Sequence, residues 1–323
     1  MNAIVVGKFY PPHNGHHYLI ETALAGSDSV EVLVVDNPRY KIPASKRKQW
    51  LEENHPTAKI TVIPDIYKDD DSQAWADHTL AFLGYKPDVV FSSESYGITW
   101  AECMGCEHVM VDVDRNTIPI SATKVRSSLT KYWPYLSPSV KRDLAIRIVV
   151  IGAESTGTTT LSKALAKKMK TPWVPEIGRY YTESLISMDY KWQDEDFYTI
   201  GALQNKYEQK MAQKSNGMIV CDTNAHTTEL WQRRYVGKTT DEMRTIGAQN
   251  PADLYIITGH EIPFIQDGIR DGEHLRREMH DWCVEQAKRT AKPYFVARGT
   301  LEKRVEESLA FINNNLDEIV RIA

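Results

Sequence analysis

The stretch AIVVGKFYPPHNGH, residues 3–16, decides how the first half of the chain folds. Residues 3–6 are consecutive apolar residues, which is typical of a buried strand in a parallel sheet. The glycine and prolines that follow end this strand and lead into a helix-like segment over residues 17–25. A buried strand, a glycine turn and a helix in this order predict the first unit of a parallel α/β sheet.

The same arrangement occurs again in the middle of the chain. Residues 148–151 form a second apolar run, and Gly152 opens a glycine turn after it. Between the two units, residues 132–138 contain two prolines. We therefore predict two doubly wound parallel-sheet α/β domains, one over residues 1–137 and the other over residues 138–323.

Other segments fit this architecture. An apolar stripe at helical spacing near the end of the chain predicts a core-facing helix, with Leu301, Val305, Leu309, Ile312, Leu316 and Ile319. A further helix is expected over residues 44–53. Further strands are predicted at 30–35, 60–63, 89–92, 218–221, 254–258 and 294–297.

The composition excludes several classes of protein. With 323 residues, 42% hydrophobic and 25% charged residues and a net charge of -4, the chain matches an ordinary globular protein without a polycationic surface for nucleic acid. The sequence contains no signal-peptide pattern and no apolar run long enough to span a membrane, so we expect a cytoplasmic protein. Its oligomeric state is not indicated, and a homo-oligomer remains compatible with the sequence.

Four cysteines are too few for a disulfide scaffold. Cys103 and Cys106, followed by His108, have the spacing of half a zinc site. A structural zinc ion needs four ligands, and no second pair is evident. The alternative is a turn that carries two reduced thiols.

The turn after the first strand has the residues needed to bind phosphate. Gly7 allows close approach of the backbone, and the following helix would present unpaired N–H groups and a partial positive charge to an anion. His13 and His16 are three residues apart, so both can project toward the same phosphate and donate to its oxygens.

A later segment, residues 112–126, supports this interpretation. Ser121 and Thr123 are placed to cap a helix that starts there. Arg126 would lie about one turn inside that helix, where it can reach a polyphosphate. Taken alone, this pattern also fits a capped surface helix.

Together the two segments resemble the nucleotidyltransferase superfamily with its GxFxPxHxGH and ISxTxxR motifs. With residues 91–94 and 111–115, the chain is similar to the NadR-type bifunctional nicotinamide-mononucleotide adenylyltransferase and ribosylnicotinamide kinase family. The resemblance extends over nearly the whole chain and implies a Rossmann-like nucleotidyltransferase domain over residues 1–137 and a P-loop kinase-like domain over residues 138–323. It implies that ATP and nicotinamide mononucleotide give NAD and pyrophosphate with Mg²⁺ on the polyphosphate. The family often carries an N-terminal helix-turn-helix repressor domain, which we do not expect here, because the sequence begins at the first catalytic strand.

By position, the resemblance assigns roles to residues of the first domain. The histidines and Arg126 would act in catalysis at the phosphates. ATP would be bound by Gly7, Lys8, Phe9, Ser121 and Thr123. The acceptor nucleotide would meet Trp50, Trp75 and Glu94, with either tryptophan stacking on the nicotinamide ring. Ordinary core packing is the alternative for both tryptophans.

In the second domain, GAESTGTTT, residues 152–160, follows the strand as a phosphate-binding loop of pattern GxxxxGK[ST]. Thr158 stands where the pattern has the lysine that reaches the β- and γ-phosphates. The loop is expected to bind ATP through Gly152, Ser155, Gly157, Thr158, Thr159 and Thr160.

Further residues of a small-molecule kinase follow the loop. Thr159 and Asp222 are the candidate Mg²⁺ ligands. By resemblance, Glu176 would orient or deprotonate a ribose hydroxyl of ribosylnicotinamide. The candidate lid over residues 266–277 would supply Arg270 to the transition state. Arg179 and Arg276 are the expected acceptor-site arginines.

The departures at Thr158 and at Asn224, where the family usually has an acidic residue, leave alternatives open. The second domain is either a kinase that uses another cation, from Lys163, Arg270 or Arg276, or a non-catalytic ATP or NAD sensor. The transferase acceptor could also be nicotinate mononucleotide, pantetheine phosphate or flavin mononucleotide. An aminoacyl-tRNA synthetase is not expected, because the chain is short and has no evident anticodon-binding module.

Overall fold

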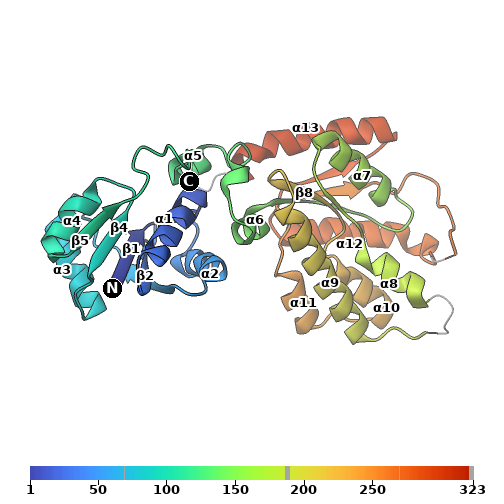
Figure 1. Cartoon of the computed structure of the whole chain (residues 1–323). Helices are drawn as coiled ribbons and strands as arrows, with labels where there is room; N and C mark the ends of the chain where they lie inside the picture. The colour runs from blue at the N-terminus through green and yellow to red at the C-terminus, as the bar shows by residue number, and fades with distance from the viewer. Residues whose placement is uncertain (69, 186–189, 269, 320–323) are drawn as a thin grey trace. The chain divides into compact units, whose positions relative to one another are not determined.

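The structure, a computed structural model, describes residues 1–68, 70–185, 190–268 and 270–319 (Figure 1). The chain divides into two compact units, the first covering Met1–Val140 and the second beginning at Lys141. Each unit is built around a five-stranded sheet. The strand pairs in both sheets are parallel, which confirms the fold class predicted from the sequence.

The first sheet has the strand order β3-β2-β1-β4-β5. Chain order reverses between β1 and β4, which are neighbours in the sheet, and a ligand crevice is expected beyond the carboxyl ends of such strands. The strands are β1 (Asn2–Gly7), β2 (Ser29–Asp36), β3 (Lys59–Pro64), β4 (Val89–Ser92) and β5 (Glu107–Met110).

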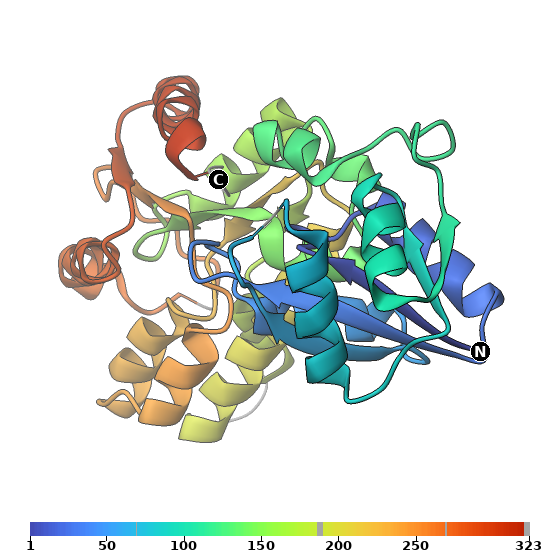
Figure 2. The ribbon, with the colours of Figure 1, turned by 90° about the vertical axis from the view of Figure 1, so that its left-hand side faces the viewer.

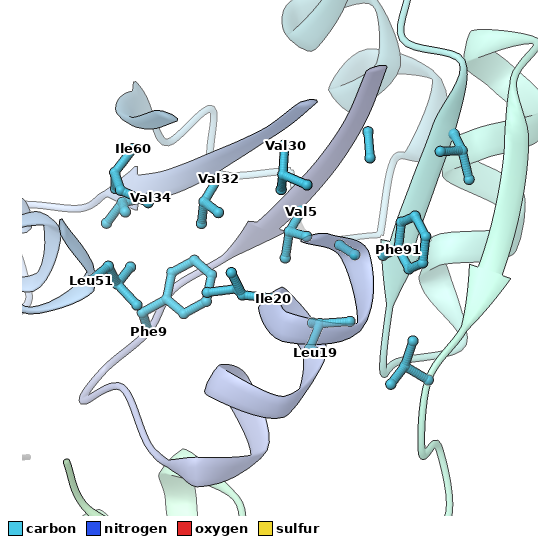
Figure 3. Packing of buried hydrophobic residues seen from close by; sticks show 14 of the residues in the cluster. Val5, Phe9, Leu19, Ile20, Val30, Val32, Val34, Leu51, Ile60 and Phe91 are labelled. Atoms are coloured by element: carbon cyan, nitrogen blue, oxygen red, sulfur yellow. The ribbon is translucent and has the colours of Figure 1, made fainter. Parts of the chain in front are cut away.

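Alternating residues of β1 serve the two faces of this sheet. Ala3 and Val5 pack with residues of α1 (Asn14–Ala25) and α2 (Ala44–Asn54), and Figure 3 shows Phe9 between Leu51 and Ile20 in the same cluster. Ile4 faces the other way and packs with α3 (Ser72–Leu83) and α4 (Tyr96–Met104). The remaining short helices of this part are α5 (Ala122–Ser127) and η1 (Trp133–Tyr135), and α6 (Pro138–Leu144) includes the boundary between the two units.

The second sheet has the order β10-β9-β6-β8-β7, so β6 pairs with both β8 and β9. The carboxyl ends of these three central strands therefore meet at one edge. The strands are β6 (Ile146–Ile151), β7 (Trp173–Val174), β8 (Met218–Asp222), β9 (Leu254–Thr258) and β10 (Tyr294–Ala297).

Two helices, α7 (Thr158–Met169) and α13 (Leu301–Ile319), share a hydrophobic cluster with β6 and cover one face of the second sheet. Figure 2 shows α12 (Arg276–Arg289) and α13 nearly end-on, on either side of the edge strand β10. None of the described helices combines the length and apolar character needed to cross a membrane. The other elements are α8 (Ile177–Leu185), α9 (Asp194–Gln213), α10 (Thr228–Val236), α11 (Asp241–Gly247) and η2 (Glu273–Leu275).

All strands and helices predicted from apolar runs are present, and the stripe on α13 packs into the core except for Leu301, which is 39% exposed. The sequence did not predict two strands at the edges of the sheets. In β5, Glu107 and His108 interrupt the apolar pattern, and β7 is two residues long. Edge strands need fewer apolar residues, so hydrophobic runs do not reveal them.

We expect Ile148→Ala to destabilise the second domain by about 2–5 kcal/mol, because Ile148 is fully buried in the central strand and its truncation leaves a cavity. Urea unfolding followed by circular dichroism measures the change. Ile98→Ala is the matched control, since Ile98 is 44% exposed on α4 and should change stability by less than about 0.5 kcal/mol. Equal effects of the two substitutions would contradict the described core.

Candidate functional site

A cavity of about 570 Å³ lies at the carboxyl edge of the first sheet. The turn after β1 contributes Gly7, Lys8, Phe9 and Tyr10 to its wall, and the turn after β4 contributes Glu94. These two turns meet because β1 and β4 are neighbours at the point where the strand order reverses.

The two histidines of the first motif are stacked, with ring centroids 3.7 Å apart. His13 is the N-cap of α1, and Nδ1 of each ring accepts the backbone N–H of the other residue at 3.3 Å. Burial lowers the pKa of His13 to about 3 and that of His16 well below its usual value, so both rings are neutral. With Nδ1 accepting, the proton of each neutral ring lies on Nε2, which is therefore a donor.

The histidines differ in access to the cavity. His16 lines it, and His13 is 4% exposed and stacks against His16. Phe9, in a left-handed conformation with φ of 44°, places its ring 5.0 Å from the His16 ring. A Cβ on Gly7 would lie 3.1 Å from the Phe9 ring, so a larger residue would displace the ring that supports His16.

Helix α5 brings the second motif to the same cavity. Arg126 and Thr123 line it, and the Arg126 guanidinium donates to Tyr10 O at 2.7 Å and to Thr123 Oγ1 at 3.1 Å. The Ser121 hydroxyl accepts from Lys124 N at 3.3 Å as the N-cap of α5. Ser121 is not among the residues that line the cavity, so its described contact is that of a helix cap.

The candidate acceptor residues divide into two groups. Trp75 and Glu94 line the cavity, and Glu94 Oε1 accepts from Arg115 at 2.6 Å. Trp50 does not line it: its side chain is 1% exposed, on the buried side of α2. The expectation that Trp50 stacks on a nicotinamide ring is therefore corrected in favour of core packing.

The sequence did not single out Arg47, which is fully buried next to the cavity wall. Its guanidinium donates to Ile42 O at 3.1 Å, to Val35 O at 3.0 Å and to Lys8 O. It also lies 5.3 Å from the ring of Tyr40. Arg47 thus joins the end of β2 to the phosphate-binding turn. Its position within a run of three basic residues gave no signal of this role.

The zinc alternative is not supported. No cluster of three or more histidine, cysteine or acidic side chains that could hold a metal ion occurs among the residues whose placement is described. His108 Nε2 is instead 2.9 Å from Ser92 Oγ. Cys103 and Cys106 pack against the core around Gly105, a left-handed C-cap.

In the second domain a cavity of about 130 Å³ lies at the end of β6. Its wall includes Gly152, Ser155, Thr158 and Thr159 of the phosphate loop. Gly157, with φ of 83°, makes the left-handed turn into α7 that this loop requires. Thr160 is exposed on α7 and is not among the residues that line this cavity.

Two carboxyl groups face this cavity, the buried one of Asp222 and the partly buried one of Glu176. Thr159 Oγ1 donates to Asp222 Oδ2 at 2.6 Å, and Glu176 lies on the same wall. Desolvation by burial raises the pKa of both Glu176 and Asp222, and their mutual repulsion raises that of Glu176 further. Oxygen donors of this kind suit Mg²⁺ beside nucleotide phosphates.

Three arginines predicted for this site occupy different places. Arg179 lines the cavity and donates to Asp267 at 2.8 Å, while Arg270 lines it from the candidate lid and donates to Ile265 O at 2.7 Å. Arg276 instead donates to Ser155 O at 3.3 Å and to Ile262 O at 2.8 Å. Arg276 therefore contacts the phosphate loop, and it is not among the residues that line the cavity. Ile269 of this segment lies outside the described residues.

An aromatic wall completes the second cavity and was not predicted. Trp192 and Tyr235 are stacked at 5.3 Å, and Phe197 lies 5.3 Å from Trp192. Trp231 belongs to the same wall. These residues come from three separate segments, so no spacing in the sequence indicated that they meet.

Asn224 is buried, and its Oδ1 accepts from Thr227 N at 3.0 Å and from Thr227 Oγ1 at 2.7 Å. It therefore stabilises the turn before α10. Asn224 is not one of the residues that line the cavity. Having an asparagine here, where the family usually has an acidic residue, therefore affects the turn before α10 in the described structure and not the cavity wall.

The fold and the two cavities define a protein with two nucleotide-binding α/β domains, one nucleotidyltransferase-like and one P-loop kinase-like. A model for the citrate lyase ligase C-terminal domain matches residues 1–64, and a model for an AAA domain matches residues 147–304.

Comparison with known proteins confirms the resemblance to NadR. The chain is 27% identical to the trifunctional NAD biosynthesis/regulator protein NadR of Salmonella typhimurium. This similarity covers 88% of this chain and 76% of that protein. It is 26% identical to the NadR protein of Escherichia coli, and this similarity covers 87% of this chain and 75% of that protein. A crystal structure of NadR in complex with NAD and AMP-PNP shares the fold, with a TM-score of 0.75, 20% identity and coverage of 97% of this chain and 95% of that chain.

We expect Glu176→Gln to reduce the pH dependence of folding stability in the second domain. The folded protein raises the pKa of Glu176 above its usual 4.5, so the folded state keeps a proton that the unfolded state releases. This carboxyl group therefore destabilises the fold increasingly as pH rises above about 4.5.

Urea unfolding from about pH 5 to about pH 8 tests this expectation. Relative to the wild type, Glu176→Gln should become more stable as pH increases. Glu306→Gln is the control, because Glu306 is exposed on α13 and should leave the slope unchanged. Identical slopes in all three proteins would show that Glu176 keeps its ordinary acidity.

Proposed function

We propose that the first domain transfers the adenylyl group of ATP to nicotinamide mononucleotide, giving NAD and pyrophosphate. The main support is a single cavity that brings together Lys8, His16, Thr123, Arg126 and Trp75. The cationic and N–H donors suit a polyphosphate, and the tryptophan suits a flat base. The NAD-biosynthesis function stated for the NadR relatives supports the same choice of reaction.

In this reaction a phosphate oxygen of the acceptor attacks the α-phosphorus of ATP, and the bond from that phosphorus to the bridging oxygen of pyrophosphate breaks. Negative charge increases on the oxygens around phosphorus and on the leaving group. The Nε2–H of the neutral His16 and the guanidinium of Arg126 donate to these oxygens. No proton needs to leave the enzyme, so neutral imidazoles are suited to this role.

We propose that the second domain phosphorylates ribosylnicotinamide with ATP. The hydroxyl oxygen attacks the γ-phosphorus, its proton passes to Glu176, and ADP leaves. The pyridinium ring of this acceptor is cationic, and the aromatic wall formed by Trp192, Trp231 and Tyr235 suits such a ring. A cation bound beside Glu176 also favours the ionised form that accepts the proton.

Thr159 and Asp222 would hold Mg²⁺ in this domain, since their oxygens lie 2.6 Å apart at the end of the phosphate loop. When bound, the ion neutralises charge on the β- and γ-phosphates. Arg270 and Arg179 line the same cavity and would add positive charge near the transferred group.

A second candidate function is favoured by Thr158, which removes the lysine expected to contact the β- and γ-phosphates. In that case the second domain binds ATP or NAD and regulates the transferase without chemistry. The retained pair of carboxyl groups and the arginines of the cavity favour the kinase.

We expect His16→Ala to lower the rate of NAD synthesis by about 100-fold or more, because a preorganised donor to the transition state is lost. Pyrophosphate release with nicotinamide mononucleotide as acceptor measures it, and the same assay with nicotinate mononucleotide identifies the preferred acceptor. His274→Ala in the other unit is the control. A decrease of less than about threefold would remove His16 from the mechanism.

We expect ADP to form from ATP in the presence of ribosylnicotinamide, and we expect Thr158→Lys to increase this rate if the missing cation limits it. Coupled detection of ADP, with chromatography of nicotinamide mononucleotide, measures the reaction. Asp222→Asn should abolish it. No ADP from either the wild type or Thr158→Lys would favour the sensor.

A further inference from the structure

The phosphate loop of the second domain is held from outside the cavity by a buried arginine. Arg304, in the first turn of α13, is 4% exposed and donates from Nη1 to Thr156 O at 2.8 Å. Its Nη2 donates to Glu261 Oε1 at 2.7 Å and to Gly259 O at 3.3 Å. One guanidinium thus connects the phosphate loop to the turn after β9.

This contact fixes the direction of one peptide group. The carbonyl of Thr156 and the N–H of Gly157 belong to the same trans peptide and point in opposite directions. Because Arg304 holds the carbonyl on its own side, the N–H of Gly157 points away from Arg304. The Thr156 hydroxyl, which donates to Ala153 O at 2.6 Å and lies 2.6 Å from Thr258 Oγ1, restrains the same residue.

The direction of this N–H matters more here than in a loop with a lysine. Thr158 cannot supply a positive charge, so within the loop itself the anion can be held only by backbone N–H groups and by the N-terminus of α7. Such donors bind phosphate only when they are oriented toward it. A peptide that rotates freely would lose this orientation.

We propose that Arg304 is a positioning residue for the phosphates of ATP in the second domain. Its guanidinium orients the peptide between Thr156 and Gly157 and so compensates in part for Thr158. This inference rests on the proposed binding of ATP to this loop. It assigns the function to a residue of α13, which belongs neither to the loop motif nor to the cavity wall.

Arg298 provides a matched control. It contacts the same carboxylate, with Nη1 3.4 Å from Glu261 Oε2, and its side chain is 54% exposed. Among the described contacts, Arg298 makes no hydrogen bond to the phosphate loop. An effect that depends only on the charge of Glu261 would appear in variants of both arginines, whereas orientation of the loop depends on Arg304.

The test is hydrogen–deuterium exchange of the full chain during titration with Mg²⁺ and ATP, read at the peptides that contain residues 152–160. This readout is specific to the phosphate loop and does not require turnover. For Arg304→Lys, which keeps the charge but loses the planar fork, we expect the ATP concentration for half-maximal protection to rise about tenfold. Arg298→Lys should change it by less than about twofold.

Steady-state kinetics give a second measurement. In Arg304→Lys, KM for ATP should rise about tenfold while kcat falls less than about threefold, because binding of phosphate is affected more than chemistry. If Arg304→Lys does not fold, Glu261→Gln removes the charge that anchors Nη2 and should raise the half-maximal ATP concentration at least about threefold. Adding Thr158→Lys should reduce the penalty of Arg304→Lys to less than about threefold.

The positioning role alone would be overturned if Arg304→Lys had the same half-maximal ATP concentration as the wild type. If only Glu261→Gln folds, the same result for that variant would overturn it. A penalty of the same size with and without Thr158→Lys would overturn the compensation for the missing lysine. If ATP gives no protection of residues 152–160 in the wild type, the proposed nucleotide binding of this domain fails, and the inference about Arg304 fails with it.

Discussion

Both candidate sites depend on one constraint, which is the way a buried parallel strand is connected to the next helix. A parallel strand ends at the carboxyl edge of its sheet, and the N–H groups of the following helix turn have no partners within the helix. After β6 the first residues of α7, Thr158 and Thr159, line the second cavity, and after β1 the turn residues and His16 of α1 line the first. Gly7 and Gly157 allow the tight turns, the first by leaving room for the Phe9 ring and the second by a left-handed backbone.

The two domains differ in how positive charge and hydrogen-bond donors are supplied beside this common feature. In the first domain, burial keeps His13 and His16 neutral, and the mutual contacts with their backbone N–H groups leave Nε2–H as the donor. Such donors stabilise charge without requiring protonation of a buried group. In the second domain Thr158 supplies no charge, so arginines outside the loop become the available cations.

The protonation of the two carboxyl groups in the second cavity depends on the charge of what the cavity binds. Desolvation by burial raises the pKa of both Glu176 and Asp222, and repulsion from Asp222 raises that of Glu176 further. A bound metal ion or cationic ring would instead lower these pKa values and favour the ionised carboxylates. The aromatic wall and the two carboxyl groups therefore both favour a cation, which is a property of the cavity and of no single motif.

The sequence by itself determined the two parallel sheets, since buried central strands require continuous apolar runs, and it located the two turns that line the cavities, since these are local in the chain. It also named Thr159 and Asp222 as candidate Mg²⁺ ligands, and the structure places their oxygens 2.6 Å apart. The tertiary structure decided that Trp50 and Arg47 are buried, and that Arg276 contacts the phosphate loop. It also assembled the aromatic wall from distant segments. A motif records local geometry, whereas the side of a helix that faces a cavity is set by packing between residues far apart in the chain.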